Sequence, residues 1–132
     1  MEKKAVVRLQ DSTFIGEINE KRINLTETGM RAVDLMLISI GYCFGLTVEA
    51  YTNHKGYKID NLKITVRGKK HEKENRYDRI TIEVSFKSDL TPEQIERVLA
   101  IGKRGCTVSN SMLKTPDIQT VYLENVNSQG GK

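Results

Sequence analysis

Two cysteines, Cys43 and Cys106, are the residues of this chain with the most reactive side chains. Free cysteine is among the most buried residue types, so one interpretation makes both thiols small core residues. The other interpretation is a dithiol pair, in which one thiolate attacks a substrate and the second thiol resolves the product. A thiolate becomes a good nucleophile where a cation or a helix N-terminus lowers its pKa. Cys106 follows Lys103 and Arg104 and opens a predicted helix, whereas Cys43 lies within a predicted helix and needs a cation from elsewhere in the fold.

Other site chemistries find little support in the sequence. His54 and His71 do not share a metal-like spacing with either cysteine, so we expect no metal site. No phosphate-binding loop, nucleophile elbow or dinucleotide fingerprint occurs, and we expect no cofactor. Gly102-Lys103-Arg104-Gly105 is a G-x-x-G pattern like the backbone clamp of nucleic-acid-binding KH domains. We prefer the interpretation that this pattern ends one helix and precedes the next.

The size and composition of the chain indicate one domain with a small hydrophobic core. Its 132 residues fit a single domain over residues 1–124, followed by a disordered tail over residues 125–132. The 38% of apolar residues is below the globular average, so we expect an oligomer to bury more surface. The net charge of +4 comes from interspersed charges, which permit nucleic-acid binding without arguing for it.

The N-terminal region carries no visible targeting signal, and we expect the chain to be cytoplasmic and not bound to a membrane. Its longest apolar stretch, Ala32–Val48, contains polar residues and is slightly short for a membrane span. We interpret this stretch as a helix buried within a protein. In the cytoplasm, two cysteines are more often reduced or redox-cycling than permanently bridged.

Hydrophobic periodicity predicts an α+β order of elements: strands, a long helix, two strands, two helices and a final strand. Leu62–Arg67 and Arg79–Lys87 alternate apolar and polar residues, which is typical of an antiparallel sheet with one packed face. Thr91-Pro92-Glu93-Gln94 has the pattern of a capping box with proline at the first helical position. The remaining predictions are strands at Ala5–Leu9, Phe14–Ile18, Arg22–Leu25 and Ile118–Leu123, a loop at Thr26–Arg31, a helix at Ala32–Asn53, a charged loop at Gly68–Asp78, a helix break at Gly102–Gly105 and a helix at Val108–Leu113.

Four stretches resemble the OsmC/Ohr family, whose names refer to osmotically induced and organic hydroperoxide resistance proteins. Val33–Cys43 is similar to the family helix E-L-L-L-A-A-L-G-x-C, with Asp34 at the acidic position. Cys106-Thr107-Val108-Ser109-Asn110 resembles C-P-V-S-N, with Thr107 replacing proline. Phe14-Ile15-Gly16-Glu17 is similar to an F-x-G-E strand, and Leu90–Ile95 resembles the L-x-x-E-Q helix start.

This resemblance implies an α+β fold with antiparallel sheets around long central helices, an intertwined homodimer and a KH-like C-terminal half. It also implies a thiol-dependent peroxidase that reduces organic or inorganic hydroperoxides in the response to oxidative stress. In that role Cys43 is the peroxidatic thiolate and Cys106 the resolving thiol. The implied partners are a small hydroperoxide and a dithiol reductant of the lipoyl or thioredoxin type.

The family activates its peroxidatic cysteine with an arginine that a glutamate holds in place. Arg8, Arg22 and Arg31 are the candidate cations here, and Glu17 and Asp34 are candidate supporting carboxylates. Asp34 lies nine residues before Cys43, so the two side chains point to opposite faces of a regular helix. Asp34 therefore acts on a site at Cys43 only if the helix begins later or if the contact crosses a dimer.

Two further functions remain open at this point. The same fold could serve as a non-catalytic module that holds an acyl or thiol-bearing ligand in an apolar pocket, with Cys43 as lining. A nucleic-acid binder acting through Lys103 and Arg104 is the less favoured alternative, and we do not expect nucleic acid among the partners.

Overall fold

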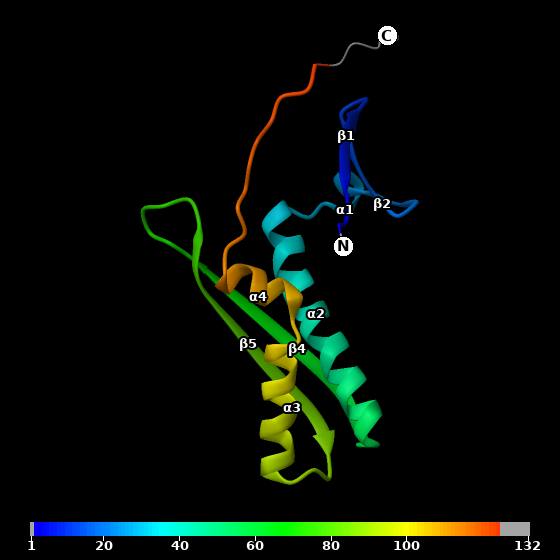
Figure 1. Ribbon diagram of the computed structural model, residues 1–132, viewed down its shortest axis with the longest axis vertical. Coiled ribbons are helices and arrows are strands. Elements are labelled where there is room, and N and C mark those ends of the chain that lie inside the picture. The colour runs from blue at the N-terminus through cyan, green and yellow to red at the C-terminus, as the bar shows by residue number, and fades with distance from the viewer. Residues whose placement is uncertain (1, 125–132) are drawn as a thin grey trace.

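The computed structural model describes residues 2–124, and it opens with a three-stranded antiparallel sheet. The strands are β1 (Val6–Gln10), β2 (Thr13–Ile18) and β3 (Lys21–Asn24), close to the predicted bounds. Two-residue turns connect them, and all four turn residues have positive φ between 48° and 67°. Turns of this kind match the twist of the paired strands. Figure 1 shows this sheet at one end of the molecule, apart from the main body.

A single helical turn, α1 (Leu25–Thr28), follows where the sequence predicted a loop, so that prediction was wrong for these residues. The side chain of Asn24 accepts a hydrogen bond from the backbone N–H of Glu27 at 2.9 Å. Gly29 ends the turn with a φ of 70°. An N-cap asparagine and a left-handed glycine are strong local helix signals, and together they stabilise this short turn.

The long helix α2 (Ala32–Lys55) runs through the body of the molecule (Figure 1). It begins where predicted and continues to Lys55, and Gly56 terminates it with a φ of 71°. Helix α2 is long and apolar enough to cross a membrane, but the core helix of a soluble protein can have the same length and composition. Three of its apolar side chains, Ile38, Tyr42 and Leu46, recur every fourth residue and are 51%, 68% and 48% exposed in a single protomer. They form one apolar stripe, because residues four apart share a helix face.

The hairpin of β4 (Ile59–Lys70) and β5 (Tyr77–Ser88) is longer than the sequence predicted. Pairing continues through Gly68↔Ile80 to Lys70↔Tyr77, so the predicted charged loop narrows to residues 71–76. His71 shapes this turn, because its Nδ1 accepts hydrogen bonds from the backbone N–H groups of residues 73 and 74. The charged residues thus sit partly in paired strands, since exposed strand positions tolerate charge.

Helix α3 (Pro92–Arg104) starts with the predicted capping box: the Thr91 hydroxyl accepts from Gln94 N–H, and the Gln94 side chain accepts from Thr91 N–H. The predicted helix break at Gly102–Gly105 is confirmed and falls at its end, because α3 continues through Gly102 to Arg104 and Gly105 is its C-cap. Helix α4 (Thr107–Leu113) follows at once. The chain therefore turns between two helices within Gly105-Cys106.

The predicted strand Ile118–Leu123 is not formed in this protomer, where residues 114–124 have no regular secondary structure. Its apolar side chains are 73% to 85% exposed: Ile118, Val121, Tyr122 and Leu123. A strand is stable only when a neighbouring strand accepts its backbone hydrogen bonds, and this segment has none among the described residues. The predicted tail over residues 125–132 lies outside the described part of the chain.

The core lies where α2 and α3 pack against the β4–β5 hairpin, which confirms the α+β fold class. Its fully packed members are Phe44, Val48 and Val98. The partly buried apolar residues that surround them come from α2, both strands and the flanking loops: Tyr51, Tyr57, Ile59, Leu62, Ile64, Ile82, Val84, Phe86 and Leu90. The side-chain hydroxyl of buried Thr52 donates to the carbonyl of Val48 at 2.9 Å, so this polar group is satisfied within α2.

Replacing Gly102 with alanine is expected to destabilise the fold by about 1–3 kcal/mol, the usual penalty for overpacking a core. A Cβ at Gly102 would lie 2.7 Å from Cζ of the Phe44 ring, which is itself buried. Urea unfolding followed by circular dichroism measures this change.

The matched control is Gly45→Ala in α2, where the new Cβ meets only the end of the Ile64 side chain at 3.1 Å. That atom can move, and alanine favours helix by about 1 kcal/mol over glycine, so this variant is expected to be at least as stable as the parent. Equal stability of the Gly102 variant and the parent would contradict the close-packing role.

Candidate redox site

Cys106 is the N-cap residue of α4, and its thiol is fully buried, with 0% exposure. Its Sγ accepts two hydrogen bonds from Ser109, one from the hydroxyl at 3.2 Å and one from the backbone N–H at 3.5 Å. These hydrogen bonds stabilise the thiolate form of Cys106 more than the thiol form, because hydrogen bonds to a charged acceptor are stronger than those to a neutral one.

Cys43 comes from the middle of α2 and is half-buried. Thr47, one turn later in α2, ties this helix to the chain before Cys106: its hydroxyl lies 3.2 Å from the Cys43 carbonyl oxygen and 3.3 Å from that of Gly105. A Cβ at Gly105 would lie 2.6 Å from the Thr47 methyl carbon, so glycine is what permits this approach. The Thr47 hydroxyl thus joins the backbone carbonyls of Cys43 and Gly105, so the fold brings the segment of Cys43 up to the residue before Cys106.

The surroundings of Cys106 change its pKa in two directions. Burial raises the pKa of the thiol, but hydrogen bonds from the Ser109 hydroxyl, the Ser109 N–H, the Cys43 side chain and the Val108 N–H outweigh it and leave the pKa of Cys106 below its usual range. The sequence pointed to two causes, the N-terminus of a helix and the cations of Lys103 and Arg104. In the structure, the hydrogen bonds at the N-terminus of α4 lower the pKa of Cys106, and neither cation is among the causes.

The candidate supporting residues Arg31 and Asp34 bond to each other at the start of α2. The Asp34 carboxylate accepts from the backbone N–H of Arg31 at 2.9 Å, and so caps the helix. At a rise of about 1.5 Å per residue, the backbone of Asp34 lies roughly 13 Å from that of Cys43 along the helix axis, and the backbone of Arg31 lies roughly 18 Å from it. Within one protomer, the structure does not bring these two residues to the cysteines.

Arg8, Arg22 and Glu17 gather on the three-stranded sheet instead. The Glu17 carboxylate lies 3.0 Å from Nε of Arg8 and 3.9 Å from Nε of Arg22. This arginine–glutamate cluster sits on the part of the chain that Figure 1 shows apart from the α2–α3–α4 body. Among residues 2–124, no group of three or more His, Cys, Asp or Glu side chains could hold a metal ion.

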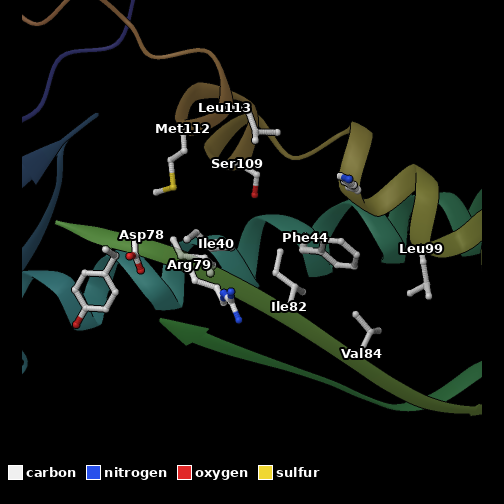
Figure 2. A pocket seen from close by; sticks show the side chains of 13 residues that line it. Ile40, Phe44, Asp78, Arg79, Ile82, Val84, Leu99, Ser109, Met112 and Leu113 are labelled. Atoms are coloured by element: carbon white, nitrogen blue, oxygen red, sulfur yellow. The ribbon is translucent and has the colours of Figure 1, made fainter. Parts of the chain in front are cut away.

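A cavity of about 540 Å³ lies beside the cysteine site, between β5 and the three helices (Figure 2). Apolar side chains form most of its wall: Ile40, Phe44, Ile80, Ile82, Val84, Leu99, Met112 and Leu113. Arg79, Asp78 and Lys103 add charge, and Ser109 joins the wall next to Cys106. Figure 2 shows Ser109 and Met112 projecting from α4 toward the side of the cavity where Ile40 lies.

Two residues of the site were missed by the sequence reasoning. Ser109 stands three residues after a cysteine that opens a helix, and this is the spacing at which an N-cap side chain meets a backbone N–H. That signal was present but assigned no role. Thr47 carried no local signal, because its contact with Gly105 joins residues 58 apart.

The family model for OsmC-like proteins matches residues 25–121. The chain belongs to the OsmC-like family. The match includes both cysteines, all of α2, the hairpin, α3 and α4, which confirms the resemblance drawn from the cysteine motifs. Proteins of this family are generally homodimers. A search of curated proteins gave no match.

Solved structures place this OsmC-like chain in the same fold. A hypothetical protein from Aquifex aeolicus VF5 is 24% identical, with a TM-score of 0.75, over 87% of this chain and 89% of that one. An OsmC-like protein from Mycoplasma pneumoniae is 13% identical, with a TM-score of 0.72, over the same shares, 87% and 89%. The organic hydroperoxide resistance protein OhrB of Bacillus subtilis is 15% identical, with a TM-score of 0.54, over 87% and 93%. At these identities the likeness establishes the fold and no more.

Proposed function

We propose that this chain is a cytoplasmic thiol peroxidase that reduces small organic or inorganic hydroperoxides through Cys43 and Cys106. The single observation that carries the proposal is that the fold brings the segments of Cys43 and Cys106 together at Thr47, although the two cysteines lie 63 residues apart in sequence. Family membership and the fold shared with a hydroperoxide resistance protein support it.

The cycle begins when the Cys43 thiolate attacks one peroxide oxygen and breaks the O–O bond. The other oxygen takes a proton and leaves as alcohol or water, and Cys43 becomes a sulfenic acid. Cys106 then attacks that sulfur, and water leaves as the disulfide forms. A dithiol reductant restores both thiols by two exchange steps and is itself oxidised to a disulfide.

Accessibility supports these two roles. Cys43 is half-buried and can meet a substrate, whereas Cys106 is fully buried and meets only groups of the protein. The first oxidation therefore belongs to Cys43. The buried, hydrogen-bonded Cys106 follows Gly105, which Thr47 ties to Cys43, and this position suits it to capture the oxidised sulfur.

The cation that activates Cys43 comes, in this proposal, from a second protomer. The cluster of Arg8, Arg22 and Glu17 lies on a sheet that contacts its own protomer mainly through α1. A partner that packs on the exposed stripe of α2 brings such a sheet near the middle of that helix, where Cys43 lies.

We expect the protein to be a homodimer, because the apolar stripe of Ile38, Tyr42 and Leu46 needs a partner to be buried. Light scattering after size exclusion should give twice the protomer mass of 15.0 kDa. Replacing Tyr42 with lysine at the centre of the stripe should shift the mass toward 15.0 kDa. A parent protein that elutes as a 15.0 kDa monomer at micromolar concentration would contradict this arrangement.

The test of the function is peroxide consumption by the purified protein with dihydrolipoamide or reduced thioredoxin as the dithiol. Turnover of cumene hydroperoxide or hydrogen peroxide beyond one equivalent per protomer is the expected result. The variant with both cysteines changed to serine serves as the blank. If the parent protein consumes both peroxides no faster than this blank with either reductant, the proposal is wrong.

The second candidate is a ligand-binding module, and the 540 Å³ apolar cavity beside Ser109 favours it. The charges of Arg79 and Lys103 suit an acyl ligand with an anionic head. Native mass spectrometry of the purified protein discriminates the two functions. A retained acyl ligand without dithiol-dependent turnover would support the binding module.

A further inference from the structure

We infer that the reductant attacks Cys43 Sγ of the oxidised protein, and that Cys106 is the sulfur expelled, held as it leaves by the hydroxyl and N–H of Ser109. Ser109 is then a positioning residue that makes one sulfur of the disulfide the better leaving group. This inference rests on the proposed function, because it describes how the same two cysteines are returned to their reduced state.

Access selects the sulfur that is attacked. An incoming thiolate has to approach the sulfur that it attacks, on the side away from the bond that breaks. Cys106 is 0% exposed, enclosed by α4 and the end of α3, while Cys43 is half-buried. A reductant thiol therefore reaches Cys43 and not Cys106.

Hydrogen bonding selects the sulfur that leaves. The Ser109 hydroxyl lies 3.2 Å and its N–H 3.5 Å from Cys106 Sγ, and both donate to that sulfur. These donors are in place before the bond breaks, so the negative charge that develops on Cys106 is stabilised without rearrangement. The lowered pKa of the Cys106 thiol agrees with this, since a thiol of lower pKa leaves faster.

The exchange balances as two steps. In the first, the reductant thiolate forms an S–S bond with Cys43, the Cys43–Cys106 bond breaks, and Cys106 takes the electron pair as a thiolate. In the second, the other thiol of the same reductant loses its proton and attacks the reductant sulfur of this mixed disulfide. Cys43 then leaves as a thiolate, and the reductant carries away the two-electron oxidation as its own disulfide.

The first experiment traps the mixed disulfide. The protein is oxidised with diamide, which makes the disulfide without any peroxide, and is then treated briefly with glutathione, whose single thiol stops the reaction at the first step. After acid quenching and alkylation, trypsin separates the two cysteines, because cleavage after Arg31 and Lys55 frees one and cleavage after Arg104 and Lys114 frees the other. Glutathione on the Cys43 peptide is expected. Glutathione chiefly on the Cys106 peptide, an even distribution, or no Cys43–Cys106 disulfide overturns the inference.

The second experiment tests Ser109. Ser109→Ala is expected to slow reduction of the diamide-formed disulfide about tenfold, since it removes one hydrogen bond to a developing charge. Ser109→Thr keeps a hydroxyl and should restore most of the rate. Ser111→Ala is the matched control in the same helix, because the Ser111 hydroxyl donates to the Thr107 carbonyl and not to a sulfur.

A thiolate titration separates this role from a merely structural one. In a Cys43→Ser background, absorbance at about 240 nm follows Cys106 alone, and Ser109→Ala should move its pKa upward while Ser111→Ala leaves it in place. An unchanged reduction rate and an unchanged pKa in Ser109→Ala would overturn the role of Ser109. Because diamide replaces peroxide throughout, a protein that fails to consume peroxide but behaves as described here separates the two proposals.

Discussion

Cys43→Ser is expected to abolish hydroperoxide turnover, with a loss of about 10³-fold or more, the scale on which removal of a nucleophile acts. A serine hydroxyl is far less ionised than a thiol and forms no sulfenic acid, so neither the first step nor the disulfide is available. The measurement is the rate of cumene hydroperoxide loss with dihydrolipoamide, compared with the parent protein at the same concentration.

The control for Cys43→Ser is the conformation of the variant. The side chain is half-buried in α2 and serine is close to it in size, so circular dichroism and the oligomeric mass should match those of the parent. If a folded variant keeps more than about a tenth of the parent rate, Cys43 is not the nucleophile. Another group would then have to react with the peroxide, or the proposed function would be wrong.

Cys106→Ser is expected to give the second-largest effect and a different kinetic pattern. The variant should consume about one equivalent of peroxide per protomer in a fast burst and show no sustained turnover, because the sulfenic acid at Cys43 finds no thiol beside it. Cys106 is the group that the fold holds next to Cys43, and its serine replacement cannot condense to a disulfide. Rapid mixing with excess peroxide, followed by mass spectrometry of the intact protein, measures the burst and the oxidised species.

After the burst, a second and slower equivalent of peroxide should oxidise the Cys106→Ser variant to sulfinic acid, while the parent accumulates disulfide. Ser111→Ala again serves as the matched control, since it alters α4 one turn away without touching either sulfur. Sustained turnover of Cys106→Ser at the parent rate would show that the reductant acts directly on the sulfenic acid. Cys106 would then have no place in the cycle.

The local signals of the sequence were sufficient for most of the fold. The capping box at Thr91, the left-handed Gly56 after α2 and the alternating apolar residues of β4 and β5 all appear in the structure. Each depends on residues within a few positions of one another, where backbone geometry and side-chain spacing act directly. The family resemblance came from the two cysteine motifs, which are local as well.

The errors arose where the decisive neighbour is distant in sequence. The helix break predicted over Gly102–Gly105 falls at Gly105, and the role of Gly102, whose missing Cβ makes room for the ring of Phe44, was not predicted. Ile118–Leu123 was predicted to be a strand, yet strand formation depends on a second strand, and the described protomer places none beside it. Local propensity favours a helix or a strand in a segment, and contacts with residues distant in sequence determine whether that element forms.

For the redox site, the sequence alone determined the two thiols, their order and the helices that carry them. Only the tertiary structure decided that the segments of Cys43 and Cys106 come together, that Cys106 is buried, and that Ser109 donates hydrogen bonds to its sulfur. The reason is physical: the approach of α2 to the α3–α4 turn depends on the absence of a side chain at Gly105 and on the Thr47 hydroxyl opposite it, 58 residues away. Such complementarity belongs to a pair of surfaces and leaves no periodic trace in either segment.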